Sequence, residues 1–287
     1  MNTATMIPTN DSSISVFGCT DAGRKRPGNE DAFLVADLTE EGGFTVNAGG
    51  HCSDESASLL VVADGMGGAA AGEVASSMAV DTLREVLTET AVEQNIGEQL
   101  KRATETANES IWTRAQQDGS LCGMGSTLTA ALVRDGVAYI AQVGDSRAYL
   151  IRGERIRQLT KDQSLVQVLI DTGYITPEQA AHHPRKNLIL QALGVSPTVK
   201  AELTTVELCR DDRLILCSDG LSNLVEPTEM QGTVAESPDP ETACRQLVEL
   251  ANERGGEDNI TVIVARFSGE NLCSSRETAI TASLHIN

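Results

Sequence analysis

The sequence has few aromatic residues, few basic residues and no long apolar run. Aromatic residues make up 3% of the 287 positions, with a single Trp, so the hydrophobic 40% must build its core from Val, Leu, Ile and Ala. Lys and Arg number 22 against 41 Asp and Glu, which leaves a formal net charge of -19. A chain with this charge is repelled at long range by nucleic acid and by anionic membranes. We therefore expect neither a nucleic-acid partner nor a membrane partner.

Two further absences concern cysteine spacing and targeting segments. The seven cysteines stand singly, and no two have the Cys-x-x-Cys spacing of a zinc or redox site. Their odd number and apolar neighbours predict reduced, mostly buried thiols, Cys217 among them. The first 20 residues have neither a basic start nor an apolar block, and no apolar stretch is long enough to cross a bilayer. These features predict a cytoplasmic protein.

Acidic residues lie at the ends of four predicted apolar strands. Each carboxylate stands where the chain enters or leaves the core, and glycines after two of them allow a sharp turn. The acids, each with its strand, are Asp64 after 59–63, Asp219 after 214–217, Asp258 before 260–267, and Glu30 with Asp31 before 32–36. Strand ends on one edge of stacked sheets can converge, so these acids are candidates for a single site.

A cluster of this kind predicts a divalent cation. Carboxylates brought together repel one another, so they need a cation between them. No His or Cys shares these positions, and oxygen ligands favour Mg²⁺ or Mn²⁺ over zinc or copper. Two such ions roughly 4 Å apart would activate a water for attack on phosphorus. In the basic turn at 24–26, the planar guanidinium of Arg26 suits a phosphate, although a solvated turn without a role is the alternative.

Strands and helices follow one another in blocks. Connections such as Asp135-Gly136 are too short for parallel crossovers, and several strands are apolar on both faces. This pattern favours antiparallel sheets stacked between helices over a doubly wound parallel sheet. We expect an exposed hairpin or loop at 38–58 and an excursion from the sheet at 160–195. Further strands are predicted at 14–19, 126–134, 136–143, 146–152, 199–208 and 213–217, and helices at about 74–87, 97–117, 163–171, 177–181 and 239–253.

Six motifs together resemble the metal-dependent serine/threonine protein phosphatases of the type 2C, or PPM, family. In chain order they are Arg26-x-x-Asn29-Glu30-Asp31, Asp64-Gly65-Met66-Gly67-Gly68, Gly123-Met124-Gly125-Ser126-Thr127, Gly144-Asp145-Ser146-Arg147, Ser218-Asp219-Gly220 and Asp258-Asn259-Ile260-Thr261. The resemblance runs from about residue 14 to residue 267 and is to the compact bacterial branch. Each motif alone is weak, but six in this order are specific.

The resemblance implies an α+β fold, a four-layer αββα sandwich of two antiparallel sheets flanked by helix pairs. It implies one catalytic domain at 13–268 with a flap at about 160–195, after a flexible N-terminus at 1–12 and before a polar tail at 269–287. The implied activity is hydrolysis of phosphoserine and phosphothreonine in proteins. The implied partners are phosphorylated proteins and a cognate Ser/Thr kinase, and we expect a monomer.

The resemblance also implies a role for each acid at the site. Two ions, Mn²⁺ or Mg²⁺, would be bridged by Asp64. Asp219 and Asp258 would hold the first ion. The second would be held by the Gly65 carbonyl and, through water, by Glu30, with Asp31 close behind it.

The reaction implied is direct attack of a metal-bridging water, with Arg26 binding the substrate phosphate and no phosphoenzyme. Eukaryotic members often carry a His as general acid where this chain has Met66, so the proton donor is unassigned. Bacterial members often bind a third ion through an Asp at the position of Ser120. Asp118, two residues earlier, is the candidate for that third metal.

Three other functions compete with this interpretation. An aspartyl-phosphate hydrolase on a doubly wound sheet would need an acid two residues after its nucleophile, where Met66 follows Asp64. A regulatory pseudophosphatase is expected to have lost a metal-binding acid, whereas Asp64, Asp219, Asp258 and Glu30 are all present. A small-molecule phosphomonoesterase would share the chemistry and differ in its substrate.

Overall fold

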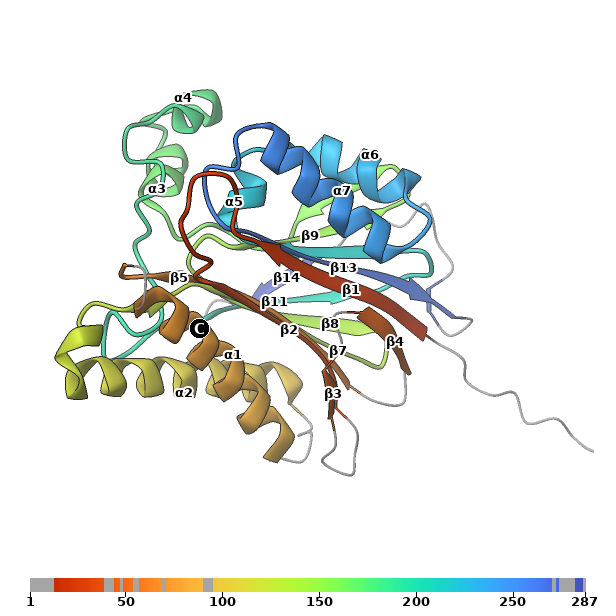
Figure 1. The fold of residues 1–287 in the computed structure, drawn as a ribbon. Helices are drawn as coiled ribbons and strands as arrows, with labels where there is room; N and C mark the ends of the chain where they lie inside the picture. The colour runs from red at the N-terminus through yellow and green to blue at the C-terminus, as the bar shows by residue number, and fades with distance from the viewer. Residues whose placement is uncertain are drawn as a thin grey trace, which may run out of the picture.

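Two antiparallel sheets pack face to face between two layers of helices (Figure 1). The computed structural model describes residues 13–38, 44–46, 49–53, 57–68, 71–89, 95–269, 272–273 and 282–285. The predicted α+β fold, with helices outside two stacked sheets, is confirmed. The predicted flexible N-terminus at 1–12 lies outside the described residues.

The first sheet has the strand order β10-β9-β12-β13-β1-β4, and all of its neighbouring strands are antiparallel. Its centre is the pair β12 and β13, in which Leu216 lies opposite Ile263. The strands are β1 (Ser13–Asp21), β4 (Gly49–Ser53), β9 (Arg147–Arg152), β10 (Arg155–Gln158), β12 (Arg213–Cys217) and β13 (Ile260–Ser268).

The second sheet has the order β14-β11-β8-β7-β5-β2-β3, with the short strand β6 paired to the end of β5. It is antiparallel throughout as well. The strands are β2 (Asp31–Leu38), β3 (Phe44–Val46), β5 (Ala57–Met66), β6 (Gly125–Ser126), β7 (Leu128–Arg134), β8 (Val137–Val143), β11 (Glu202–Glu207) and β14 (Ala282–His285).

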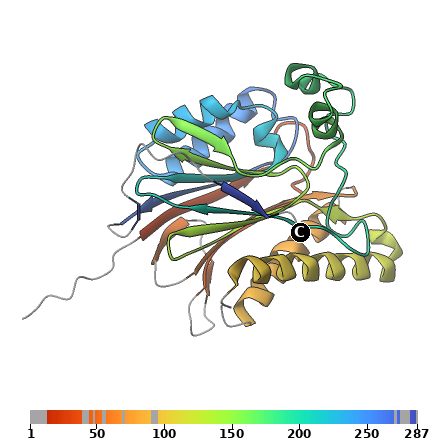
Figure 2. The same ribbon diagram turned by 180° about the vertical axis from the view of Figure 1, so that it is seen from behind.

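Helices cover the outer face of each sheet. The second sheet is covered by α1 (Ala71–Glu89) and α2 (Ile96–Gln117), which is followed by a 3₁₀ turn at Gly119–Leu121. The first sheet is covered by α5 (Asp219–Ser222), α6 (Pro227–Glu236) and α7 (Pro240–Glu253). Two short helices, α3 (Leu165–Asp171) and α4 (Pro177–Ala181), stand away from both sheets, as Figure 2 shows.

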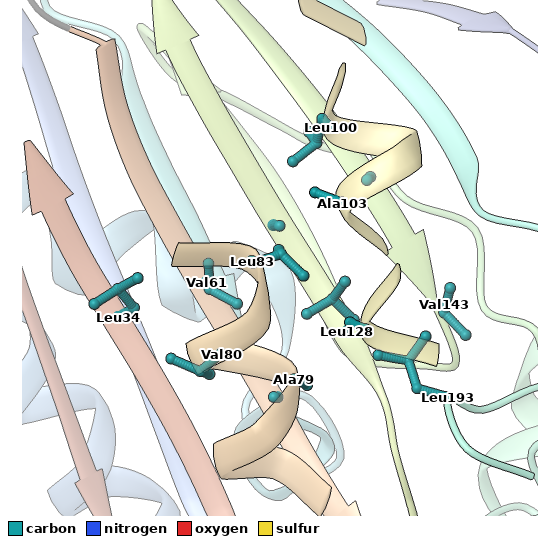
Figure 3. Close-up of a cluster of buried hydrophobic side chains, with 14 of the residues drawn as sticks. Leu34, Val61, Ala79, Val80, Leu83, Leu100, Ala103, Leu128, Val143 and Leu193 are labelled. Atoms are coloured by element: carbon teal, nitrogen blue, oxygen red, sulfur yellow. The ribbon is translucent and has the colours of Figure 1, made fainter. Parts of the chain in front are cut away.

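The apolar run of β5 fills two cores at once. Because successive side chains of a strand point to opposite faces, Leu59 and Val61 pack against the helices while Leu60 and Val62 pack between the sheets. Figure 3 shows the helical side of this arrangement, where Val61 lies near Val80 and Leu83 of α1. This double burial explains why the strand has no polar alternation.

Local sequence signals set the boundaries of several helices. The Asp239 side chain accepts a hydrogen bond from the Thr242 backbone N–H at 2.7 Å, and Pro240 occupies the first turn of α7, as the sequence predicts. In the excursion at 160–195, Thr176 and Gln179 form a capping box at the start of α4. None of the helices in the described part of the chain combines the length and the apolar character needed to cross a membrane.

Several elements were not predicted from the sequence. Helix α6 buries only Met230 and Val234, which is too sparse a pattern to indicate a helix. Strands β10 and β14 lie at sheet edges, where one side of the strand has no partner strand. Their sequences therefore need fewer apolar residues and lack a clear strand pattern. Strand β14 lies in the segment predicted as a polar tail and pairs with β11.

The segment predicted as an exposed hairpin or loop at 38–58 is described only in part. Strand β3 pairs antiparallel with β2, in keeping with a hairpin, whereas β4 joins β1 in the other sheet. The exposure of residues 39–56 lies outside what the structure describes.

Candidate active site

A pocket of about 390 Å³ lies where strand ends from both sheets meet. Five acidic residues from distant parts of the chain line it together with one arginine: Glu30, Asp64, Asp145, Asp219, Asp258 and Arg26. The structure therefore brings together the acids that the sequence placed at strand ends. Asp31 lies directly behind them, because β2 pairs Asp31 with Asp64 of β5.

The backbone of Asp64 is held from both sides. Its N–H donates to Thr127 Oγ1 at 3.0 Å, and its carbonyl accepts from the Thr127 N–H at 2.8 Å and from Ser126 Oγ at 3.0 Å. Thr127 thereby separates β6 from β7, where the sequence predicted one continuous strand. The Gly-Ser-Thr segment thus fixes the position from which the Asp64 carboxylate projects.

Glycines let the backbone pack closely behind the acids. A Cβ at Gly65 would overlap the carbonyl oxygens of Gly72 and Glu30, and a Cβ at Gly72 would collide with the Glu30 carboxylate. The first turn of α1 therefore packs directly against Glu30. Gly72 was not singled out from the sequence, because its partner is a side chain more than 40 positions earlier.

Asp31 is buried and only half satisfied. Ser218 Oγ and Thr261 Oγ1 both donate to Asp31 Oδ2, at 2.8 and 2.6 Å, whereas the buried Oδ1 has no hydrogen-bond partner among the described residues. Burial raises the pKa of Asp31 to about 7 against the lowering effect of these two hydroxyls. A buried carboxylate with one oxygen that accepts no hydrogen bond is suited to binding a cation or a polarised water.

Asp219 and Asp64 show the same deficit of positive charge. Asn223 Nδ2 donates to Asp219 Oδ2 at 3.0 Å, and Asp219 Oδ1 is buried with no partner among the described residues. Burial, followed by the charge of Asp258, raises the pKa of Asp219. Burial, followed by the charges of Asp31 and Asp219, raises the pKa of Asp64 well above its usual value. The pocket therefore fits a divalent cation, which would satisfy the unpartnered oxygens and offset the repulsion.

Asp145 adds to this negative field. It follows β8 and lines the pocket, and burial together with the charge of Asp219 raises its pKa to about 7. In the sequence it belongs to the motif Gly144-Asp145-Ser146-Arg147, and no ligand role is assigned to it. Its charge also raises the pKa of Asp64.

Arg26 reaches the pocket through an ion pair. Its Nη2 donates to Asp258 Oδ2 at 2.6 Å, and half of the guanidinium side chain remains exposed. This hydrogen bond raises the pKa of Arg26. No three His, Cys, Asp or Glu side chains in the described part of the chain are already arranged around one metal position.

Asn259 ties the loop that carries Arg26 and Glu30 to the start of β13. Its Oδ1 accepts from the Glu30 N–H at 2.9 Å, and its Nδ2 donates to the carbonyls of Ala22 and Gly28 at 3.0 and 2.8 Å. The sequence placed Asn259 in a motif without assigning it this role. The sequence signal for this role is that the polar Asn259 stands between Asp258 and the apolar strand at 260–267.

The flap contributes two further residues that the sequence did not single out, Asn187 and Ile189. Gln163 anchors this segment, since its Oε1 accepts from the Gly144 N–H at 2.8 Å and its carbonyl accepts from the Leu190 N–H at 2.7 Å. The excursion at 160–195 therefore lies at the edge of the pocket.

Other residues considered from the sequence lie elsewhere. Asp118 does not line the pocket: its Oδ1 accepts from the Ser120 N–H and hydroxyl, and its carboxylate lies 3.5 Å from Arg114. Arg147 makes a bidentate contact with Asp162. Cys217 is a buried core residue, as predicted, and burial raises its pKa to about 12, the opposite of the shift that activates a thiol.

Comparison with known proteins adds independent information. The family model described as Protein phosphatase 2C matches residues 46–254. The chain is 40% identical over 248 residues to the serine/threonine phosphatase stp of Listeria welshimeri, covering 85% of this chain and 92% of that protein. It is 37% identical over 253 residues to protein phosphatase PhpP of Streptococcus pneumoniae, covering 88% and 96%. The crystal structure of the catalytic domain of serine threonine protein phosphatase PstP, in complex with 2 manganese ions, matches with a TM-score of 0.76 and 34% identity, covering 90% of this chain and 99% of that chain.

Proposed function

Because the chain belongs to the protein phosphatase 2C family, we propose that it hydrolyses phosphoserine and phosphothreonine in proteins with the help of divalent cations. The observation that carries this proposal is the pocket where Asp64, Asp219 and Asp258 meet, with the buried Asp219 Oδ1, and Asp31 Oδ1 behind it, without a hydrogen-bond partner among the described residues. Relatives named as serine/threonine phosphatases cover most of the chain.

The residues in the pocket and the manganese in the PstP structure support a two-metal set. We propose that Asp64 would be shared by two Mn²⁺ or Mg²⁺ ions and that Asp219 and Asp258 would hold the first. The Gly65 carbonyl and, through water, Glu30 would hold the second, with Asp31 close behind Glu30. When bound, the ions supply an activated water and offset the charge that builds on phosphorus.

The chain's own residues position the substrate. The Arg26 side chain is half exposed, so its guanidinium is open to a substrate phosphate. The phosphate would replace Asp258 as the partner of Arg26 when Asp258 binds a cation. Met66, also in the lining, cannot donate a proton, so the leaving group takes its proton from water. Asn187 and Ile189 of the flap border the pocket where the residues flanking a phosphorylated side chain would lie.

The finer assignments are proposals of the same kind. We place the enzyme in the cytoplasm as a monomer with one catalytic domain at 13–268, acting on proteins that a Ser/Thr kinase has phosphorylated. The acidic surface and the singly spaced cysteines support this location. A third ion, for which Asp118 is the candidate ligand, stays a prediction from sequence.

The competing functions fare differently. The antiparallel sheets exclude the doubly wound sheet of the aspartyl-phosphate hydrolase hypothesis. A pseudophosphatase is not favoured, because Glu30, Asp64, Asp219 and Asp258 line the pocket and Asp31 lies directly behind it. A small-molecule phosphomonoesterase would need the same acids, so the substrate decides between them.

The decisive experiment compares substrates with and without metal. We expect a phosphothreonine peptide to be hydrolysed with added Mn²⁺ or Mg²⁺ and hydrolysis to stop on addition of EDTA, measured as phosphate release. Restoring excess Mn²⁺ should restore the rate, which separates metal removal from denaturation. Hydrolysis of small phosphate esters with no activity on phosphopeptides or phosphoproteins would contradict the proposed substrate class, and activity that survives EDTA would contradict the metal requirement.

Replacing Arg26 with Ala is expected to raise KM for a phosphopeptide by about tenfold, with a smaller effect on kcat, because a charge-assisted hydrogen bond to phosphate is lost. Steady-state kinetics measure both constants. Arg24→Ala is the matched control, since Arg24 belongs to the same turn but does not line the pocket. An unchanged KM in Arg26→Ala would remove Arg26 from the site.

A further inference from the structure

A second pocket, of about 610 Å³, lies at the end of the first sheet that is remote from the acidic pocket. Arg213 opens β12, whereas Asp219 follows the end of that strand, and Arg266 lies near the end of β13, whereas Asp258 precedes its start. Five arginines line this arginine pocket: Arg152, Arg155, Arg210, Arg213 and Arg266. Such a concentration of positive charge stands out in a chain with a net charge of -19.

The arginines come from the same end of four neighbouring strands and include two cross-strand pairs. Arg155 of β10 lies opposite Arg152 of β9, and Arg213 of β12 lies opposite Arg266 of β13. Because Arg213 is paired with Ile151 and not with Arg152, the two pairs project from opposite faces of the sheet, and both line the pocket at its end. Like charges directly opposite one another destabilise a sheet, so each pair costs stability unless negative charge offsets it.

The protein itself offsets only part of this charge. Arg152 is satisfied by a buried ion pair with Asp212, at 2.7 Å. Arg210 donates to the Gly269 carbonyl, and Arg266 lies 3.3 Å from Asp211 in a contact open to solvent. These contacts leave little carboxylate for the remaining arginines, because Glu154 and Asp211 are the only acids among the described lining residues.

Two guanidinium groups in the arginine pocket have no partner among the described residues. Arg155 is exposed, Arg213 is half-buried, and neither has a hydrogen bond or an ion pair to any residue that the structure describes. Burial, followed by the nearby charge of Arg266, lowers the pKa of Arg213. A half-buried guanidinium beside another one gains more from an anion than a solvated surface arginine does.

We propose that the arginine pocket binds a phosphoryl dianion, either free phosphate or a phosphoryl group carried on a phosphorylated residue. A carboxylate offers one pair of oxygens to one guanidinium fork, whereas a phosphoryl group offers three oxygens. These suffice for Arg213 and Arg266 on one face of the sheet and for Arg155, which lines the pocket from the other face. Its two charges also match the two guanidinium groups without partners. This site is separate from the acidic pocket, and its binding does not depend on hydrolysis.

Equilibrium dialysis with radiolabelled inorganic phosphate tests the proposal on the Mg²⁺-loaded full chain. We expect two bound phosphates per chain, one in each pocket. The Arg155→Gln/Arg213→Gln variant should lose one of them, with at least about tenfold weaker binding at that site, and should still hydrolyse p-nitrophenyl phosphate at the native rate. Arg26→Ala should weaken only the other site. Arg155→Gln alone changes an exposed residue, so weaker phosphate binding in this variant supports the proposal even if the double variant is unstable.

Control variants and ligands make the result specific. Lys101→Gln/Arg102→Gln on α2 removes the same charge elsewhere, and an equal loss of phosphate binding there would show a general electrostatic effect and overturn the proposal. So would unchanged binding in Arg155→Gln/Arg213→Gln, or equal competition by acetate. In the Arg26→Ala background, binding of a phosphonate analogue of a phosphothreonine peptide would identify the carried group, and binding of inorganic phosphate alone would identify the free ion. An inactive native chain would contradict the proposed function, whereas the phosphate lost in Arg155→Gln/Arg213→Gln would still report on the arginine pocket.

Discussion

Replacement of Asp64 with Asn is expected to lower kcat for metal-dependent hydrolysis of a phosphothreonine peptide by about three orders of magnitude. The charges of Asp31, Asp219, Asp145 and Asp258 all raise the pKa of Asp64. An ionised carboxylate at this position therefore indicates a cation nearby, and an amide in its place would weaken cation binding by several kcal/mol.

The same electrostatics distinguish loss of function from loss of folding in this variant. A raised pKa in the folded state means that ionising Asp64 opposes folding once the pH rises above the ordinary value for Asp. The neutral Asn mimics the protonated acid. The metal-free variant should thus melt at the same temperature as the metal-free native chain at pH 7.5, or above it, while Mn²⁺ should stabilise the native chain far more than the variant.

Two measurements therefore decide the role of Asp64, namely steady-state kinetics and melting curves with and without Mn²⁺. Asp145→Asn is the matched control, because it neutralises an acid in the same pocket to which no ligand role is assigned. Its loss of turnover should be much smaller. Full turnover in Asp64→Asn would refute the assignment of Asp64 as the shared metal ligand.

The largest effect on stability is expected at Asp212. Its carboxylate accepts from Arg152 Nε at 2.9 Å, from Arg152 Nη2 at 2.7 Å and from the Cys209 N–H at 2.7 Å. The Asp212 and Arg152 side chains are only 1% and 5% exposed. Asp212→Ala leaves a buried guanidinium without a counter-charge, and removing one partner of a buried pair costs about 3–5 kcal/mol of unfolding free energy.

Urea denaturation measures this loss, and the adjacent residue provides the control. Asp211 makes a solvent-open contact of 3.3 Å with Arg266 and has a φ of 66°, a conformation that Asn tolerates, so Asp211→Asn should cost less than about 1 kcal/mol. Arg152→Met/Asp212→Leu removes both charges together and should recover most of the lost stability. If the two single Asp variants lost equal stability, the buried pair would not be the source of the effect.

The predictions that succeeded rest on information local to a few residues. The apolar run of β5 is continuous because it faces two cores, and the Asp-Gly that ends it marks the exit from them. Asp239 and Pro240 mark the start of α7 by their own hydrogen-bonding chemistry. The excursion at 160–195 could be recognised because its polar composition breaks the strand pattern.

The contacts within the site could not be predicted in this way. Arg26 and Asp258 are 232 positions apart, and whether they meet depends on the register of β1 against β13. The bonds from Asn259 to the loop at 22–30 depend on the same register. The arginine pocket shows the limit most clearly, because its members are unremarkable as single residues and become a group only when four strands align.

The amino-acid sequence by itself determined the layered α+β class, the strand ends that carry acids, and the family to which six short motifs point, because each of these depends on neighbours along the chain. Only the tertiary structure decided which oxygens are left without partners, how Arg26 and Asp258 pair, and where a second cluster of charge assembles. Those features depend on strand register and on the packing of the layers. Both result from contacts between residues far apart in the chain, so no single segment of the sequence reveals them.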